Sequence, residues 1–414
     1  MITAAHMNRA ASLPLIFTFA AAAACTQEST APVYADAQQS SEALPWPARD
    51  APGQLLPGIS TLLRDVVQAK DVGNTFMVQA NRMPFSNTYW PFIDNGIDDD
   101  WSGQGSPLSK YMRFFDSSSE QSARAWEQTQ HGSALPDVQD WFGHCNGWSA
   151  AATSVAPPLH AVNVRIEGGT VLSCADGDPR CTRFEVSDIH ALLTEVYLDG
   201  PQRVLGDRCE VAPGDIARDG SGRITSPGCG GVNAGTFMSV LARRIKNDAL
   251  PFVMAVQSPN TTNQIWNQPV AGYTVYGYRP LSRSQAVGLV GAGVTRSYDW
   301  NPAARGWVRV DVGVRYVVET HPTMSPFSGA SAWDELRFSA VLELTGPTVQ
   351  SSTRVLGGEY LDLPALGANR LRVAPFVWIA AGTGPAVVKN PSTSTHNPWL
   401  NPTLVTFLAS ESRK

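Results

Sequence analysis

The order of helical and strand-like patterns along the chain is the feature that most restricts its fold. Helical patterns occur at 60–70, 106–130, 186–199 and 233–248, and a short helix that ends before two prolines is expected at 149–154. Strand-like runs occur at 251–257, 270–278, 306–320, 336–346, 353–363 and 375–382. Helices followed by strands predict an α+β fold, in which a β-rich C-terminal part of antiparallel strands packs on a mixed part.

The first 58 residues differ in composition from the rest. Arg9 precedes an apolar run, Leu13 to Ala24, that is shorter than the roughly 20 residues needed to span a bilayer and is typical of a secretory signal. The stretch that ends at Cys25 also resembles a lipobox, so Cys25 is either lipidated, as a membrane tether, or follows a simple cleavage site. We expect a secreted or cell-envelope protein with a signal peptide at 1–24, a tether at 25–58, an α+β core at 59–282 and a β-rich part at 283–414.

Composition argues against one class of function. Charged residues make up 16% of the chain, below the typical value of about 25%, and the formal net charge is −5. A nucleic-acid-binding protein is expected to carry a basic face, so we expect no nucleic-acid partner.

The cysteines divide into two sequence-local pairs and a remainder. An exported chain can form disulfides. Cys174 and Cys181 close a short loop of turn residues, and Cys209 and Cys229 bracket a glycine-rich segment. Pairing between neighbours is one of the three connectivities that four cysteines allow. With Cys25 in the signal region, Cys145 is then the odd cysteine, either buried and inert or retained because it reacts.

Cys145 lies in DWFGHCNGW (140–148), directly before a short helix that ends at two prolines. A helix N-terminus stabilises a thiolate, which is the nucleophilic form. Gly143 and Gly147 allow close backbone approach, and the aromatic residues around them, Trp148 included, could exclude water. A buried structural cysteine at the start of a core helix is the alternative. His144 is a structural neighbour as readily as a base, because adjacent helical residues do not face each other.

The stretch IWNQPVAGYTVYG (265–277) resembles the surface peptide of the transglutaminase-elicitor family, known from the cell wall of the oomycete Phytophthora. Other stretches also resemble this family: YWPFIDNGIDDDW, SPLSKY, GHCNGW, VSDIHALL, NAGTF, VLGGEY and PFVW. The similarity extends over about residues 80–410. The chain therefore resembles an exported, bacterial-type homologue of this family.

The resemblance implies transglutaminase chemistry on a loosely papain-like core, with Cys145 at a helix N-terminus that faces an antiparallel sheet. Cys145 would attack the γ-carboxamide of a glutamine, release ammonia and pass the acyl group to a lysine amine. The partners would be proteins or peptides with glutamine and lysine side chains. Candidate substrate-binding residues are Asn146, Trp148, Trp266, Asn267, Gln268 and Pro269. The alternatives are core packing for WNQP, and, for the whole chain, a cysteine peptidase or deamidase, or a non-catalytic envelope binding protein with a decayed site.

The base that would serve Cys145 is left open by the sequence. Asp188 or His190, both in VSDIHALL, or the adjacent His144 could orient or deprotonate the thiol. The family commonly has a histidine where Met238 stands, so this departure puts a Cys–His pair in doubt.

The resemblance also implies calcium dependence. Asp94, Asp98 and Asp100 in DNGIDDDW gather carboxylate oxygens of the kind calcium prefers. They do not follow the EF-hand order, and an acidic turn can equally be solvated. No cofactor is firmly expected, and calcium is the candidate.

Overall fold

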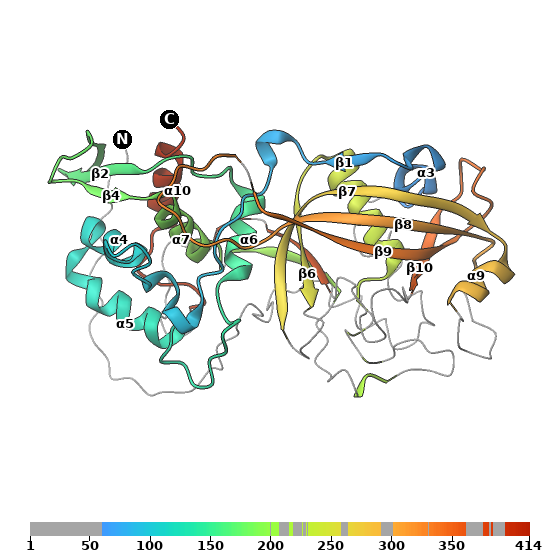
Figure 1. Cartoon of the computed structure of the whole chain (residues 1–414), viewed down its shortest axis with the longest axis horizontal. Helices are drawn as coiled ribbons and strands as arrows, with labels where there is room; N and C mark the ends of the chain where they lie inside the picture. The colour runs from blue at the N-terminus through green and yellow to red at the C-terminus, as the bar shows by residue number, and fades with distance from the viewer. Residues whose placement is uncertain are drawn as a thin grey trace.

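Figure 1 shows a computed structural model of the whole chain, with α4, α5, α6, α7 and α10 on the left and a large sheet, flanked by α3 and α9, on the right. The structure describes residues 60–198, 200–206, 215–217, 226, 229, 231–257, 264–290, 301–329, 331–361, 376–380, 382–383 and 394–414. The expected signal peptide and tether, with Cys25, lie outside these residues, as does Cys209. The mixture of helices and antiparallel strands confirms the predicted α+β class.

One antiparallel sheet of eight strands forms the β-rich side. Its order is β10-β9-β8-β7-β6-β11-β5, and β1 pairs with β7 outside this path. The strands are β1 (Thr75–Met77), β5 (Gln202–Gly206), β6 (Phe252–Gln257), β7 (Ile265–Leu281), β8 (Gly306–Val317), β9 (Trp333–Leu344), β10 (Val355–Leu361) and β11 (Phe376–Ala380). The boundary expected at 282/283 falls within this sheet, so the core and the β-rich part share it.

Strand β7 is longer than its alternating pattern indicates. The pattern predicts a strand at 270–278, whereas β7 has 17 residues and begins at Ile265. Its first part pairs with β6, and the part from Val270 onward pairs with β8. The less regular stretch WNQP is a strand because its residues pair with those of β6. This pairing is a long-range effect that the periodicity of the sequence does not reveal.

Most helices precede the long strands β6–β9 in sequence, α9 lies between β7 and β8, and α10 follows the last strand. The α-helices are α3 (Leu63–Val66), α4 (Pro107–Phe115), α5 (Glu120–Gln130), α6 (Cys145–Ser154), α7 (Val186–Tyr197), α8 (Ala234–Leu241), α9 (Arg283–Val290) and α10 (Pro402–Glu411). Shorter helical turns are η3 (Ala69–Asp71), η4 (Ala80–Arg82), η5 (Phe92–Asp94), η6 (Gly96–Asp98) and η7 (Ser117–Ser119), and a π-helix, η9 (Ala242–Asn247), extends α8.

The helical segment predicted at 106–130 is two helices. Ser106 caps α4 as expected, because its Oγ accepts the N–H of Ser109 at 3.0 Å and a proline follows it. Asp116 accepts hydrogen bonds from Ser118 at 2.6 Å and Ser119 at 2.7 Å. These local bonds compete with the helix and separate α4 from α5.

Helix α6 belongs to one of two hydrophobic cores and also packs on the large sheet. One core joins the sheet to α8, and the other lies among α4, α6, α7 and α10. Gly147 allows α6 to approach α7 closely, since a Cβ there would overlap the carbonyl oxygen of Thr194. The opposite side of α6 packs on β7, with β6 and β11 beside it. The start of α6 is thereby held between a helix and a sheet.

A second, small sheet lies beside the helices (Figure 1). It has the order β3-β2-β4, with β2 at Val162–Glu167, β3 at Thr170–Ser173 and β4 at Thr182–Phe184. A disulfide between Cys174 and Cys181, with Cα atoms 6.5 Å apart, closes the loop between β3 and β4. The predicted pairing of these two cysteines is confirmed.

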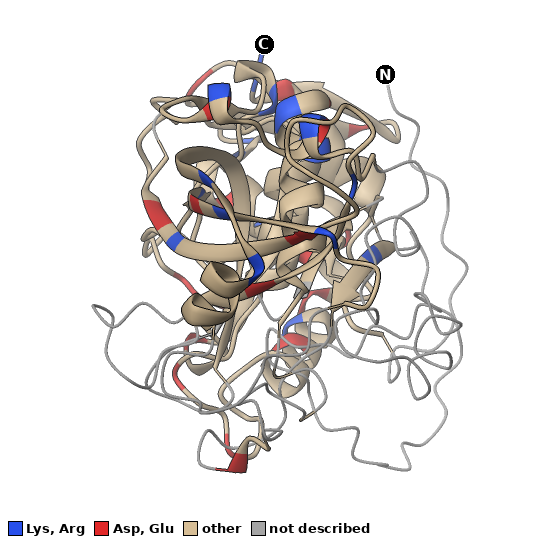
Figure 2. Ribbon diagram, turned by 90° about the vertical axis from the view of Figure 1, so that its right-hand side faces the viewer, with Lys and Arg blue, Asp and Glu red and all other residues tan. Residues whose placement is uncertain are grey.

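Charged residues of both signs are interspersed on the face in Figure 2, and neither sign dominates it. No helix in the described part of the chain has the length and apolar character needed to cross a membrane.

Candidate functional site

The residues before α6 are fixed by the segment YWPF (89–92). The N–H of His144 donates to the carbonyl oxygen of Tyr89 at 2.6 Å. A Cβ at Gly143 would lie 2.6 Å from the same oxygen, so glycine is required for this approach. Cys145 is the first residue of α6, and no side chain caps the helix. The predicted position of Cys145 at a helix N-terminus is confirmed.

Cys145 faces strand β7. Its side chain is buried, and Nδ2 of Asn267 donates to its Sγ at 3.5 Å. Nε1 of Trp378 donates to Oδ1 of Asn267 at 3.0 Å, which orients the amide with its NH2 group toward the sulfur. A hydrogen-bond donor at this position favours the charged form of the sulfur over the neutral thiol. The structure thus joins two of the sequence stretches singled out above, GHCNGW and WNQP.

Cys145 is disulfide-bonded, and none of the cysteines among the described residues is a free thiol. The expectation that Cys145 is unpaired is therefore wrong. It assumed that sequence neighbours pair, whereas the fold determines which sulfur atoms meet. Cys229 is also disulfide-bonded, and its predicted partner, Cys209, lies outside the described residues. A sulfur held in a disulfide is no nucleophile, so reduction must precede any attack by Cys145.

Two aromatic rings form a rim next to this site. Trp266, adjacent to Asn267 in β7, meets Tyr89 edge to face with ring centroids 5.0 Å apart. The hydroxyl of Tyr89 donates to the carbonyl oxygen of Asp140 at 2.9 Å. Both rings are partly exposed, so they can contact a ligand as well as shield the site from water.

Trp148 and Asn146, which are predicted to bind substrate, both form side-chain hydrogen bonds within the protein. Trp148 is fully buried in the helical core, and its indole N–H donates to the carbonyl oxygen of Phe85 at 3.0 Å. The structure thus assigns Trp148 to packing instead of to a wall around substrate. Asn146 is partly exposed, and its Oδ1 accepts the N–H of Gly147 at 2.9 Å.

Gln268 leads to a carboxyl group that sequence reasoning missed. Its Nε2 donates to Oε1 of Glu319 at 2.9 Å, and the next residue, Pro269, is buried. Burial raises the pKa of Glu319 to about 7, against the effect of hydrogen bonds from its own backbone and from Gln268. A carboxyl group with a pKa near neutrality next to WNQP is a candidate functional group. In the sequence, Glu319 stands near the end of the β-patterned run at 306–320, and nothing else marks it.

Glu319→Gln should stabilise the protein in alkaline but not in acidic solution. Because the folded-state pKa is raised, the folded protein retains a proton that the unfolded chain loses between about pH 4.5 and 7. Stability therefore falls as pH rises through this window and stays lowered above it. We expect the substitution to add ~2 kcal/mol at pH 8 and almost nothing at pH 4.5, allowing for partial exposure. Urea unfolding at both pH values measures the difference, and an equal gain at both would contradict the assignment.

Asp188 and His190, the other predicted supporting residues, make no hydrogen bond to Cys145. Asp188 binds Nζ of Lys110 at 2.7 Å and Nε1 of Trp101 at 3.1 Å. His190 stacks on Phe85 with ring centroids 4.7 Å apart, and burial lowers its pKa to about 3. Met238 is buried in the hydrophobic core beside the sheet. Asp188 and His190 therefore serve α7 and its packing.

The side chain of His144 joins a buried cluster with Glu127, His131 and Glu195. Burial lowers the pKa of His144 to about 3, against the effect of Glu195. In His131 the two carboxylates outweigh burial and raise its pKa to about 10. Sequence reasoning missed this cluster because its members come from three helices. The only local signal is the Glu127–His131 pair, one helical turn apart.

The acidic turn proposed for calcium is largely occupied by protein contacts. Asp98 is buried and accepts from Ser106 at 2.7 Å, Arg124 at 2.8 Å and Gln128 at 2.7 Å. Asp100 accepts a backbone N–H at 2.8 Å, and Asp94 is exposed. Calcium binding here stays a prediction, without support from the contacts of Asp98.

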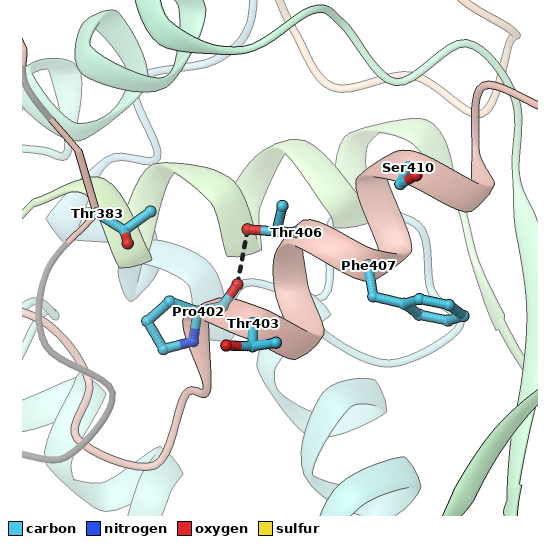
Figure 3. Close-up of a pocket in the computed structure, with 6 residues that line it drawn as sticks. All are labelled: Thr383, Pro402, Thr403, Thr406, Phe407 and Ser410. Carbon is cyan, nitrogen blue, oxygen red and sulfur yellow. Dashed lines mark hydrogen bonds between the residues drawn. The ribbon is translucent and has the colours of Figure 1, made fainter. Parts of the chain in front are cut away.

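A pocket of ≈ 450 Å³ lies along α10 and shares no lining residue with the Cys145 site (Figure 3). Its lining residues are Thr383, Pro402, Thr403, Thr406, Phe407 and Ser410, and the hydroxyl of Thr406 donates to the carbonyl oxygen of Pro402 at 2.7 Å. None of these side chains ionises, so we assign the pocket no chemistry.

Comparisons with known proteins agree with the resemblance seen in the sequence. The family model described as transglutaminase elicitor matches residues 117–389, well over half of the chain. The crystal structure of the GP42 transglutaminase from Phytophthora sojae is similar with a TM-score of 0.58 and 19% sequence identity. The match covers 86% of this chain and 97% of that one, which shows a shared fold. No curated protein matches the sequence.

Proposed function

The chain belongs to the transglutaminase elicitor family, and from this premise we propose that it is a protein-glutamine γ-glutamyltransferase with Cys145 as nucleophile. The observation that carries the proposal is the hydrogen bond from Asn267 to the Cys145 sulfur. It places a polarising amide from the family-like stretch WNQP on the candidate nucleophile. The loosely papain-like arrangement expected from sequence is part of this proposal.

The first step is reduction of the Cys145 disulfide by an external dithiol. A thiolate of the reductant attacks one sulfur, the S–S bond breaks, and the second thiol closes the reductant into its own disulfide. Two electrons pass to the protein, and Cys145 becomes a thiolate or thiol. The N-terminus of α6 and the amide of Asn267 then both favour the thiolate.

Acyl transfer then follows in two halves. The thiolate bonds to the γ-carbon of a glutamine side chain, the C–N bond breaks, and the amide nitrogen takes a proton from water and leaves as ammonia. A lysine amine attacks the thioester, the C–S bond breaks and the amine gives up a proton to solvent. An isopeptide remains and the thiolate is restored. The amide of Asn267 can also stabilise the oxyanion in each half. Trp266 and Tyr89 shield the thioester from water, which would otherwise give deamidation.

Asn267→Ala should lower kcat/KM for acyl transfer by about 10²-fold, the usual effect of removing one such donor. The substitution also leaves the indole N–H of Trp378 without its acceptor, which costs about 1–3 kcal/mol of stability. Steady-state kinetics on the reduced protein, paired with a melting curve, separates the two effects. Trp378→Phe, which removes the other half of that hydrogen bond, is the matched control. An unchanged kcat/KM in folded Asn267→Ala would exclude the contact from catalysis.

Incorporation of monodansylcadaverine into casein, with calcium present, tests the activity directly. We expect no incorporation by the oxidised protein and incorporation with ammonia release after treatment with a dithiol. Peptide cleavage without ammonia release would instead select a cysteine peptidase, and ammonia release without incorporation would select a deamidase. The Cys145 disulfide is the one observation that favours a non-catalytic envelope binding protein. Reduced, folded protein that does none of these reactions would support that alternative.

We propose an exported location for this reaction. The Cys174–Cys181 disulfide supports it, because disulfides persist mainly outside the reducing cytosol. Cleavage after the signal at 1–24, with or without lipidation of Cys25, would then release or tether the protein near partners with glutamine and lysine side chains.

A further inference from the structure

Four buried side chains meet near the N-terminus of α6. The proposed acyl transfer uses none of them. Glu127 lies in α5, His131 follows that helix, His144 precedes α6 and Glu195 lies in α7. One nitrogen or oxygen from each lies within 4.8 Å of all the others. Glu127, His144 and Glu195 are fully buried, and His131 is 9% exposed. Two imidazoles and two carboxylates are a donor set that suits a divalent transition metal.

The separations within this cluster suit a shared metal better than direct hydrogen bonds. Nδ1 of His131 lies 3.6 Å from Glu127 Oε1 and 3.5 Å from Glu195 Oε1. Nε2 of His144 lies 3.8 Å from Glu127 Oε1 and 3.5 Å from Glu195 Oε2. Hydrogen bonds between such atoms are about 2.7–3.2 Å long. A tetrahedron with metal–ligand bonds of about 2.0–2.2 Å has edges of about 3.3–3.6 Å, close to the distances observed.

Several donor atoms in the cluster are buried without a hydrogen-bond partner. They are Nδ1 of His131, both ring nitrogens of His144 and Oε2 of Glu195. Burying such atoms unpaired is costly, and few occur in folded proteins. One atom from each of these three side chains could bind a single ion, and in His144 that atom is Nε2, which faces the carboxylates. These unpaired atoms therefore indicate a missing common partner. Divalent charge also fits, because the four side chains would carry a net charge of −2 once His131 has lost its proton to bind the metal.

Both carboxylates also accept hydrogen bonds from one residue. Asn397 donates its Nδ2 to Glu127 Oε2 at 3.0 Å and its backbone N–H to Glu195 Oε1. Hydrogen bonds of this kind orient ligands around metal ions. Gly96 completes the wall, since a Cβ there would lie 2.8 Å from Glu127 Oε1 and 3.0 Å from Cε1 of His144. The ring of Phe92 covers both histidines, with centroids 5.2 Å from His131 and 4.9 Å from His144.

We infer that Glu127, His131, His144 and Glu195 form a structural site for a divalent transition metal, with zinc the best fit. Calcium is a poor fit, because it prefers oxygen ligands and six to eight of them. The metal would join α5, α6 and α7 at the residue before Cys145, and so fix the start of the helix that carries the sulfur. This metal is distinct from the calcium that the family resemblance implies, for which the acidic turn is the candidate site.

Metal content of the oxidised full-length protein tests this inference independently of acyl transfer. The protein is purified without a histidine tag, freed of metal with pyridine-2,6-dicarboxylate, and titrated with Zn²⁺ or Co²⁺. Reductant is omitted so that no thiol binds metal. We expect about one Zn²⁺ per chain by mass spectrometry, a visible absorption band of tetrahedral Co²⁺, and a higher melting temperature with Zn²⁺ than without.

Glu195→Gln and His131→Gln should each lower bound Zn²⁺ at least ~10-fold, because each removes a direct ligand. His190→Gln is the matched control. His190 is a buried histidine, as His131 is, and lies on α7, as Glu195 does, but it is outside the cluster. It should retain the metal. Circular dichroism identifies any variant that fails to fold, and the wild-type titration stands regardless. Wild-type protein that takes up no Zn²⁺ and no Co²⁺, or equal metal loss in folded His190→Gln, would overturn the inference.

Discussion

Cys145→Ala should eliminate incorporation of monodansylcadaverine by the reduced protein, with a loss of at least ~10⁴-fold in kcat/KM. The effect is large because no other atom can carry the acyl group. Asn267 and the rim of Trp266 and Tyr89 can polarise and shield a thioester, but they form none. The measurement is the initial rate with dithiol present for both proteins, so that the former disulfide partner of Cys145 cannot form a new bond.

The double substitution Cys174→Ser and Cys181→Ser is the matched control for Cys145→Ala. It also removes a disulfide, but one that closes a surface loop between β3 and β4. We expect it to retain the wild-type rate while losing roughly 2.5 kcal/mol of stability, the value for a loop of this length. Incorporation that survives Cys145→Ala would remove Cys145 from the proposed mechanism altogether.

Trp148→Ala should lower the free energy of unfolding by about 3–5 kcal/mol. The substitution leaves a cavity among α4, α6, α7 and α10. It also removes the hydrogen bond from the indole N–H of Trp148 to the carbonyl oxygen of Phe85. Urea denaturation followed by circular dichroism measures the loss.

Trp266→Ala serves as the comparison for Trp148→Ala, because Trp266 is a partly exposed ring beside Asn267. We expect it to change stability by less than about 1 kcal/mol and to raise the ratio of deamidation to crosslinking, since the thioester loses cover. A Trp148→Ala protein of normal stability with an increased KM would show instead that Trp148 contacts substrate, as first expected from its sequence position.

The fold could be predicted from sequence wherever one local pattern decides the structure. Alternation within GWVRVDVGVRYVVET gave a strand prediction at 306–320, and β8 occupies Gly306–Val317. Serine followed by proline marked the start of α4. Helix α10 carries the same kind of signal, since Asn401 caps it and Pro402 is its first residue, but it was missed. The short strands β2, β3 and β4 were missed because three to six residues give too little periodicity.

The candidate site was predictable only in part, because it is made by distant segments. The motif around Cys145 identified the sulfur and its helix, and the resemblance identified WNQP. The disulfide state of Cys145 depends on which sulfur the fold brings near it, and spacing along the chain gave the wrong answer. Glu127 and His131 are one helical turn apart, but Glu195 is 68 positions from Glu127 (195 − 127), and no local pattern joins it to them. Glu319 is close to Gln268 only because β8 runs beside β7.

The shared ladder of β7 and β8 has a consequence for any shortened version of this chain. A fragment that stops at 282 keeps the whole of β7 but discards the strand that pairs with it from Val270 to Leu281. That side of β7 would become a long, exposed edge of apolar residues, a recognised template for aggregation. The amide of Asn267 would also lose Trp378, which lies in the discarded part. The C-terminal third is thus an integral component of the wall opposite Cys145, and no separable module.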